Sequence, residues 1–253
     1  CSSDLLTKII GACDSQDEKE LWTNLLRACA DGRRTGLGTH GLADALACLG
    51  MPYDSADALV TIDKIYNTLK ESAYTESVWL SKERGSFPVF DWEREKDNGF
   101  IKSLSPSLQN AIKTFGRRNI SILTNAPTGS VSIMSQTSSG LEPVFRNFYI
   151  RRRKLSHNEQ DQMAAFVDAM GDRWTEYKVY HQNVQEYLKK YETEEIPAFF
   201  TESDKIDWKR RVEIQGVIQK HIDHSISSTI NLPKGTRPDV VSELYRLGDR
   251  KST

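Results

Sequence analysis

Short apolar stretches separated by long helical stretches dominate this sequence and limit what it can fold into. The clearest apolar stretch contains Ile120, Ile122 and Leu123, and it stops at Asn125-Ala126-Pro127. A second strand-like stretch, 32–41, is rich in glycine, and a third, 225–233, alternates small polar with apolar residues. Because long helical crossovers connect these stretches, the strands are expected to pair in parallel with helices outside them. The expected fold class is therefore α/β, as a sheet or a barrel.

Helical periodicity and capping residues predict the crossovers. Ser55 is a candidate N-cap and Gly85 a candidate stop for the longest of them, and Pro238 is suited to start the last. Between 155 and 205 the pattern predicts helical pieces alternating with loops. The expected helices are 17–30, 42–49, 55–84, 107–115, 158–170, 184–191, 206–221 and 239–247.

Small and turn-forming residues follow the strand at 120–123 and make the strongest candidate binding site. Their backbone N–H groups are shielded by no bulky side chain, and free amides that converge in a loop bind oxyanions without a cationic side chain. Ligands of parallel α/β folds also gather at the carboxyl ends of strands. The predicted phosphate-binding residues are Ala126, Pro127, Thr128, Gly129, Ser130, Val131 and Ser132. The alternative is a tight turn after a strand, and a Walker-type loop is excluded because no lysine follows before Lys154.

Composition narrows the functional classes further. The 253 residues suffice for one large domain or two small ones, and 34 basic against 35 acidic residues leave a net charge of −1. This balance indicates no attraction to nucleic acid or to an anionic membrane. No apolar run approaches the ~20 residues of a membrane span and no signal-peptide pattern opens the chain, so the cytoplasm is the expected location. The chain begins with Cys1 and stops at Thr253 after a helical pattern, which indicates a piece of a longer protein.

Four weaker sequence patterns could indicate a function, but each also has a simpler structural explanation. Gly36, Gly38 and Gly41 have GxGxxG spacing, but no apolar strand precedes them, which argues against a dinucleotide site. The basic run 151–154 is better explained as a solvated face or local ion pairs than as a nucleic-acid contact. Glu142 is a candidate acid or base, or a cap for the loop amides. A metal site at His221, Asp223 and His224 is not favoured, because such spacing is common by chance.

Four ordered motifs resemble the catalytic subunit of class II ribonucleotide reductases. They are GRRTGLGTHGLADALACLG (32–50), LSKERGSFPVFDWEREK (80–96), RRNISILTNAPTGSVSIMSQTSSGLEPVF (117–145) and DHSISSTINLPKGT (223–236). The resemblance implies the later part of the ten-stranded α/β barrel of this family, here a partial barrel with helical crossovers. It also implies that the loop at 126–132 holds the phosphates of a ribonucleoside di- or triphosphate that is reduced by thiyl-radical chemistry.

The resemblance also suggests a cofactor and a reductant. Class I subunits carry a tyrosine pair where this chain has Ser228-Thr229-Ile230-Asn231, and the glycyl-radical motif of class III is missing. Adenosylcobalamin is therefore the implied radical source, although its contacts are not assignable to residues, and a thioredoxin-like protein is the implied reductant.

The family's radical-cysteine loop, of Asn-Pro-Cys-Gly/Ser-Glu type, has no counterpart in this chain. Cys1, Cys13, Cys29 and Cys48 lack its flanking residues, so no catalytic residue is assigned here, and core packing is the expected role of Cys29 and Cys48. We expect one α/β domain over 1–253 that lacks the N-terminal half of the barrel and needs it as a partner. The alternative is a non-catalytic nucleotide-binding or complementing half of a split enzyme.

Overall fold

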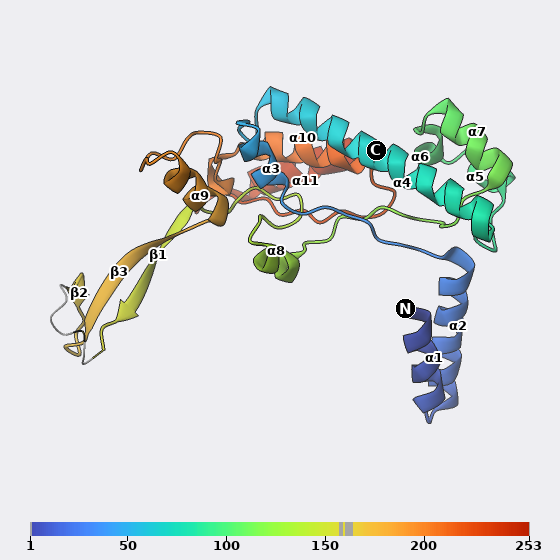
Figure 1. Cartoon of the computed structure of the whole chain (residues 1–253), viewed down its shortest axis with the longest axis horizontal. Helices are drawn as coiled ribbons and strands as arrows, with labels where there is room; N and C mark the ends of the chain where they lie inside the picture. The colour runs from blue at the N-terminus through green and yellow to red at the C-terminus, as the bar shows by residue number, and fades with distance from the viewer. Residues whose placement is uncertain (1, 157–158, 160–163, 253) are drawn as a thin grey trace.

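Helices make up most of the fold, and the computed structural model describes residues 2–156, 159 and 164–252. The long helix α4 lies beside α10 on one side of the body, with α3 at one end and α5 to α7 at the other (Figure 1). None of the described helices is long and apolar enough to cross a membrane. The helices are α1 (Ser2–Ala12), α2 (Gln16–Gly32), α3 (Leu42–Cys48), α4 (Ala56–Arg84), α5 (Trp92–Glu95), α6 (Gly99–Lys102), α7 (Pro106–Phe115), α8 (Gly129–Ser135), α9 (Gln182–Lys190), the 3-10 turn η2 (Ser203–Lys205), α10 (Trp208–Gln219) and α11 (Pro238–Ser252).

Most helix ends follow the capping residues that the sequence offered. The Ser55 side chain accepts a hydrogen bond from the Ala58 N–H at the start of α4, and Gly85 ends that helix with a φ of 77°. Pro238 is the first residue of α11. The predicted helices at 17–30, 42–49, 55–84, 107–115, 184–191, 206–221 and 239–247 are therefore confirmed, with ends that shift by a few residues or, in α11, extend by five.

Three extended segments run beneath α4 and α10 and pair in parallel. The first two are joined by hydrogen bonds from the Thr35 N–H to the Ser121 carbonyl (3.0 Å) and from the Leu37 N–H to the Ile122 carbonyl (2.8 Å). The third joins through Asn125, whose carbonyl accepts from the Ser227 N–H (2.9 Å). The spatial order is therefore 32–37, 120–125, 225–227, as expected for an α/β fold with helical crossovers. The strand predicted over 225–233 is wrong beyond 227, because 228–233 forms no strand.

The middle segment is anchored to the helices by charged side chains. The Asp223 carboxylate accepts hydrogen bonds from the backbone N–H groups of Ile122 (2.9 Å) and Leu123 (2.8 Å), and from the hydroxyl of Tyr74 on α4. Upstream, the buried Arg117 guanidinium pairs with Glu95 (2.8 Å) and donates to the carbonyls of residues 119 and 120. These contacts satisfy backbone groups that a longer ladder would have satisfied.

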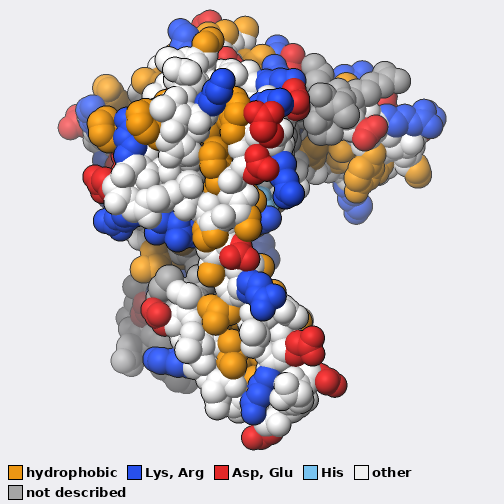
Figure 2. Space-filling model, turned by 90° about the vertical axis from the view of Figure 1, so that its right-hand side faces the viewer, with side chains coloured by type: hydrophobic (Ala, Val, Ile, Leu, Met, Phe, Trp, Pro, Cys, Tyr) orange, Lys and Arg blue, Asp and Glu red, His pale blue; other side chains and the backbone are white. Residues whose placement is uncertain are grey.

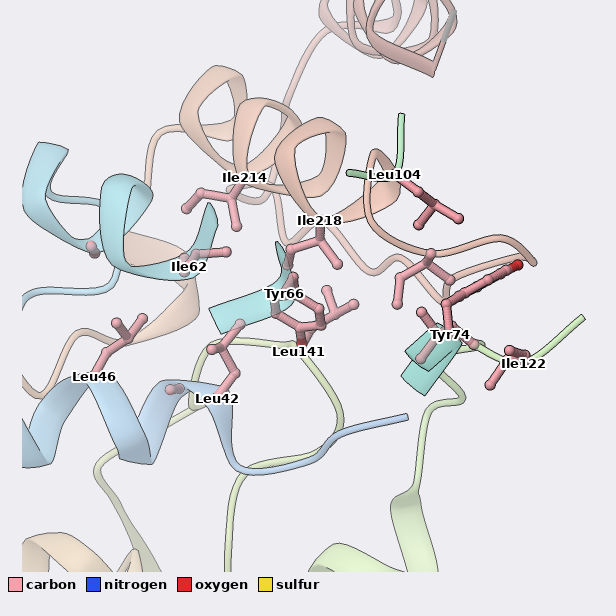
Figure 3. Close-up of a cluster of buried hydrophobic side chains, with 14 of the residues drawn as sticks. Leu42, Leu46, Ile62, Tyr66, Tyr74, Leu104, Ile122, Leu141, Ile214 and Ile218 are labelled. Carbon is pink, nitrogen blue, oxygen red and sulfur yellow. The ribbon is translucent and has the colours of Figure 1, made fainter. Parts of the chain in front are cut away.

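The main core lies between the extended segments and the helices. Ile214 and Ile218 of α10 point toward Ile62 and Tyr66 of α4, and Leu141 packs below them (Figure 3). All five side chains are almost fully buried. Ile62, Tyr66, Ile214 and Ile218 therefore dock their helices on each other, and Leu141 brings the chain that follows the candidate loop into the same core.

Two parts project from this body. The α1–α2 pair extends away from it and shows hydrophobic side chains among charged ones (Figure 2); Leu5, Leu21 and Leu25 are 59%, 56% and 42% exposed. The other part is an antiparallel hairpin arm, defined here as β1 (Phe148–Lys154), β2 (Phe166–Val167) and β3 (Arg173–Tyr180), in the order β1-β3-β2 (Figure 1).

The hairpin arm corrects the sequence-based prediction for this region. The helix expected over 158–170 is wrong where the structure describes it, because Phe166–Val167 is a strand and a turn follows; residues 157–158 and 160–163 lie outside the described part. The basic run forms the end of β1, where Arg152, Arg153 and Lys154 pair with Glu176, Glu159 and Asp172. It is thus a local ion-pair network, the simpler of its two explanations.

Removal of the Asp223 carboxylate should destabilise the fold strongly. In Asp223→Ala the N–H groups of Ile122 and Leu123 lose their acceptor, and we expect the free energy of unfolding to fall by about 2–4 kcal/mol. Asp239→Ala is the matched control, because that carboxylate pairs with Arg237 at the surface and should contribute less than about 0.5 kcal/mol. Urea unfolding of both variants measures the difference, and equal losses would contradict the anchoring role of Asp223.

The glycine at position 38 is required by close packing of two backbones. A Cβ atom built at Gly38 would lie 2.1 Å from the Thr124 carbonyl oxygen, whereas one at Gly99 would meet no heavy atom within 4 Å. Gly38→Ala should therefore force the first two extended segments apart and lower the unfolding free energy by about 1–3 kcal/mol. Gly99→Ala should leave it nearly unchanged. Thermal unfolding tests this, and a Gly38→Ala protein as stable as the parent would rule out the close approach.

Candidate functional site

The candidate loop begins where the middle extended segment ends. Asn125, only 1% exposed, holds this point: its Oδ1 accepts from the N–H (2.8 Å) and the hydroxyl (3.0 Å) of Thr39, and its Nδ2 donates to the Thr39 carbonyl (3.3 Å). The Thr39 hydroxyl also contacts the Tyr66 hydroxyl on α4 at 2.6 Å. The loop therefore leaves the body from a rigid point at the carboxyl end of a strand, as the sequence predicted.

Thr128 gives the loop its shape. Its backbone is left-handed, with φ 55° and ψ 29°, a conformation that is unfavourable for a β-branched residue. A hydrogen bond from the Gly140 N–H to the Thr128 Oγ1 (2.8 Å) compensates for this cost, and the Ser132 N–H donates to the Thr128 carbonyl (2.8 Å). The chain then enters α8 directly, and the first three N–H groups of this helix have no acceptor within it.

These three amides, of Gly129, Ser130 and Val131, are the donors that the loop offers. All three residues are exposed, and no described residue accepts a hydrogen bond from their N–H groups. The space beyond Gly129 is open, because a Cβ built there meets nothing within 4 Å. The arrangement can donate several hydrogen bonds to one anionic group outside the protein surface.

The other predicted residues of the loop have different places. Ala126 and Pro127 are exposed and lead into the loop, and Pro127 has no N–H to donate. Ser132 is buried and its hydroxyl bonds to the Gly129 carbonyl and to Ser139, both at 2.8 Å. The structure thus brings all seven residues together, but the N–H of Ser132 is used inside the protein.

The turn after α8 supports the loop from behind, and sequence reasoning missed its anchor. Asp44 on α3 accepts hydrogen bonds from the Ser138 N–H (2.6 Å) and from the His181 imidazole (2.7 Å). Burial raises the pKa of the Asp44 carboxyl, but the hydrogen bonds from His181, Ser138 and Asn183 outweigh burial and hold the pKa below its usual range. The available signal was an acidic residue in the first turn of a helix that follows Gly41.

Glu142 follows the turn after α8 and shares an open groove with Ser132 of the candidate loop. The groove has a volume of about 890 Å³ and is also lined by Ser138, Tyr149 and His181. No hydrogen bond among the described residues joins Glu142 to an amide of 126–132. The capping role that the sequence suggested for it is therefore not seen.

The remaining sequence candidates are dispersed. His221 bonds to Asp63 (2.9 Å), Asp223 binds strand amides, and the described residues contain no group of three potential ligands placed to hold a metal ion. Gly36 and Gly38 lie on the first extended segment against Thr124 rather than at a cofactor cradle. Cys29 and Cys48 are exposed free thiols, so the expectation that they pack in the core is wrong, and Cys1 lies outside the described residues.

Comparison with known proteins places this geometry in a family. The family model described as ribonucleotide reductase, barrel domain, matches residues 22–251. The chain is 31% identical over 84% of its length to a vitamin B12-dependent ribonucleoside-diphosphate reductase of Mycobacterium tuberculosis, and 28% identical over 85% to one of Thermoplasma acidophilum. It covers 29% and 26% of those two proteins, so it spans less than a third of their length.

A solved structure shares the fold. The class Id ribonucleotide reductase alpha subunit of Actinobacillus ureae superposes with a TM-score of 0.66 at 18% sequence identity, over 99% of this chain and 42% of that one. This likeness confirms the expected fold, a part of the α/β barrel of these enzymes. The parallel segments, the match over 22–251 and the shared fold lead to one conclusion: the chain belongs to the ribonucleotide reductase barrel-domain family.

Proposed function

We propose that this chain is part of a cobalamin-dependent ribonucleotide reductase and supplies the loop that binds the phosphates of the substrate. The observation that carries the proposal is a row of amides, at Gly129, Ser130 and Val131, that find no acceptor among the described residues. They follow the carboxyl end of an extended segment in a barrel domain of this family. Its relatives are named ribonucleoside-diphosphate reductases, which supports a ribonucleoside di- or triphosphate as the ligand.

Each residue of the proposed site has a role that its geometry supports. The N–H groups of Gly129, Ser130 and Val131 donate to phosphate oxygens, and the dipole of α8 favours the negative charge. Ala126 and Pro127 form the outer wall of the loop, and Thr128 sets its left-handed turn. Ser132 holds the loop closed through its bond to the Gly129 carbonyl. The loop binds and orients the substrate, and no residue of this chain is assigned to the chemical step.

Adenosylcobalamin is the cofactor that we propose for the complete enzyme, because relatives over most of this chain are named vitamin B12-dependent. Ser228 and Thr229 are exposed at the end of the third extended segment, where class I subunits carry a tyrosine pair, and this difference supports a radical source other than a partner subunit. The contacts of the cofactor are not assigned to residues. When bound, this cofactor supplies the radical that starts ribonucleotide reduction. We propose a thioredoxin-like reductant, the remaining part of the barrel as a partner, and the cytoplasm as the location.

A reconstitution experiment tests the enzyme assignment. The chain is mixed with a candidate N-terminal half of a class II reductase, adenosylcobalamin, a dithiol and a ribonucleotide, and deoxynucleotide is measured by chromatography. We expect product that depends on both halves and on the cofactor. No product under any pairing would favour the alternative, a non-catalytic nucleotide-binding half. Product without cobalamin, after addition of a ferritin-like radical-generating partner, would favour a class I enzyme.

Replacement of Gly129 by valine tests the loop directly. In Gly129→Val the side chain enters the open space in front of the amides, and we expect nucleoside diphosphate binding to weaken by about 1–3 kcal/mol, roughly 5- to 150-fold in Kd. Gly99→Val is the matched control, because Gly99 is also the first residue of a short helix and its Cβ position is equally open. Isothermal titration measures both. Unchanged affinity in a folded Gly129→Val protein would reject the proposed role.

A further inference from the structure

The Asp44 carboxylate joins three parts of the chain that are distant in sequence. It is 5% exposed and lies in the first turn of α3, just after the left-handed Gly41 (φ 77°). Its Oδ2 accepts from the Ser138 N–H at 2.6 Å, and its Oδ1 accepts from the His181 Nε2 at 2.7 Å. One carboxylate therefore connects the body, the turn behind the loop and the hairpin arm.

The turn that Asp44 holds is in direct contact with the candidate loop. The Ser138 carbonyl accepts a hydrogen bond from the N–H of Gly41, the N-cap residue of α3 (2.9 Å). Both backbone groups of Ser138, its N–H and its carbonyl, are therefore bonded to the start of α3. Two residues later the Gly140 N–H donates to the Thr128 Oγ1 (2.8 Å), and a Cβ on Gly140 would lie 3.0 Å from the Ala126 carbonyl. Because the turn and the loop are packed this closely, a displacement of the turn must displace Thr128.

On its other side Asp44 holds the base of the hairpin arm. His181 follows β3 directly and is the N-cap residue of α9. Its backbone N–H donates to the Asn147 carbonyl (2.8 Å), next to the start of β1. Two strands of the hairpin arm, β1 and β3, therefore meet at the residue whose imidazole binds Asp44.

The ionisation of Asp44 fixes which partner donates in its hydrogen bonds to Ser138 and His181. Its hydrogen bonds hold the carboxyl pKa below the usual range, so the group is a carboxylate at neutral pH and only accepts. His181 must then carry a proton on Nε2, and Ser138 donates from the backbone. An asparagine of the same size is neutral and has only one acceptor oxygen, so both bonds lose their charge assistance, and the bond on the NH2 side survives only if that side faces His181 and the imidazole changes tautomer.

We propose that Asp44 is a positioning residue for the loop. Through Ser138 and Gly140 it sets the left-handed turn at Thr128 and hence the position of the loop amides. Through His181 it ties that position to the hairpin arm. The inference rests on the proposed phosphate-binding role of the loop. Asp44 is not offered to the ligand, because it is 5% exposed and both of its oxygens accept hydrogen bonds from within the protein.

The test compares Asp44→Asn with the other described pair of a carboxylate and an imidazole. Asp63 on α4 bonds to His221 at 2.9 Å, and no hydrogen bond among the described residues joins either side chain to the turn or the loop, so Asp63→Asn is the control. Inorganic pyrophosphate is the probe, titrated into the same 253-residue chain by calorimetry. We expect Asp44→Asn to weaken pyrophosphate binding tenfold or more and Asp63→Asn to change it less than twofold.

Hydrogen exchange followed by mass spectrometry gives a readout that needs no ligand. We expect amides in 126–142 to exchange at least tenfold faster in Asp44→Asn than in the parent, with no such change in Asp63→Asn. His181→Leu removes the donor from the hairpin arm and should produce the same pattern with a smaller amplitude. It also serves as the second variant if Asp44→Asn does not fold.

The two readouts separate the two proposals. If the parent does not bind pyrophosphate, the proposed function fails, while the exchange pattern still decides whether Asp44 positions the loop. The positioning role is overturned if, in Asp44→Asn, the amides of 126–142 exchange at the parent rate while those of 42–48 or 182–190 exchange faster. It is also overturned if both aspartate variants raise exchange equally over the whole chain.

Discussion

Parallel pairing of one short backbone segment, 120–125, underlies the structure. It lies between two other extended segments and makes few ladder hydrogen bonds of its own, so side chains complete its pairing. Asp223 accepts from two successive N–H groups, and the buried Arg117 donates to two carbonyls at its beginning. Unpaired backbone groups are costly in a protein interior, and these charged contacts therefore stabilise the segment where its neighbours leave backbone groups unpaired.

The candidate site follows from where that strand ends. Asn125 terminates the pairing and Thr39 holds its side chain, which leaves the next residues without a place in the sheet. The left-handed Thr128 then turns the chain into α8, so the first amides of the helix find no acceptor among the described residues. Strain at Thr128 persists because Gly140 and the turn at 138–140 are themselves fixed by α3. The site is thus built by the body behind it, as expected for a loop that must keep its shape without a ligand.

Membership of the ribonucleotide reductase family accounts for a candidate anion-binding loop at the end of an extended segment in a barrel-like fold. The match to the ribonucleotide reductase barrel domain covers nearly the whole chain, and the relatives extend well beyond it. The segments that project from the body, α1–α2 and the hairpin arm, expose large apolar side chains such as Leu21, Ile150 and Met170. Within the described residues, the body holds the main core and the loop, and the hairpin arm joins the body at its base, where Tyr180 packs against a second small core cluster.

Sequence alone determined the local elements and the position of the loop. Ser55, Gly85 and Pro238 mark helix ends by backbone chemistry that acts within one turn, and the small residues after Leu123 mark the loop. The four ordered motifs are also sufficient by themselves to indicate the family. The hairpin arm was missed because charged and apolar residues share both faces of β1, so no alternation indicated a strand.

Only the tertiary structure decided which groups support the site. Asp44, Ser138 and His181 are far apart in the chain, and Thr128 adopts a backbone conformation that its own side chain disfavours. The exposure of Cys29 and Cys48, in place of the expected core packing, was decided in the same way. The physical reason is that capping and periodicity depend on neighbours within a few residues, whereas burial and hydrogen-bond partners depend on which distant segments pack together.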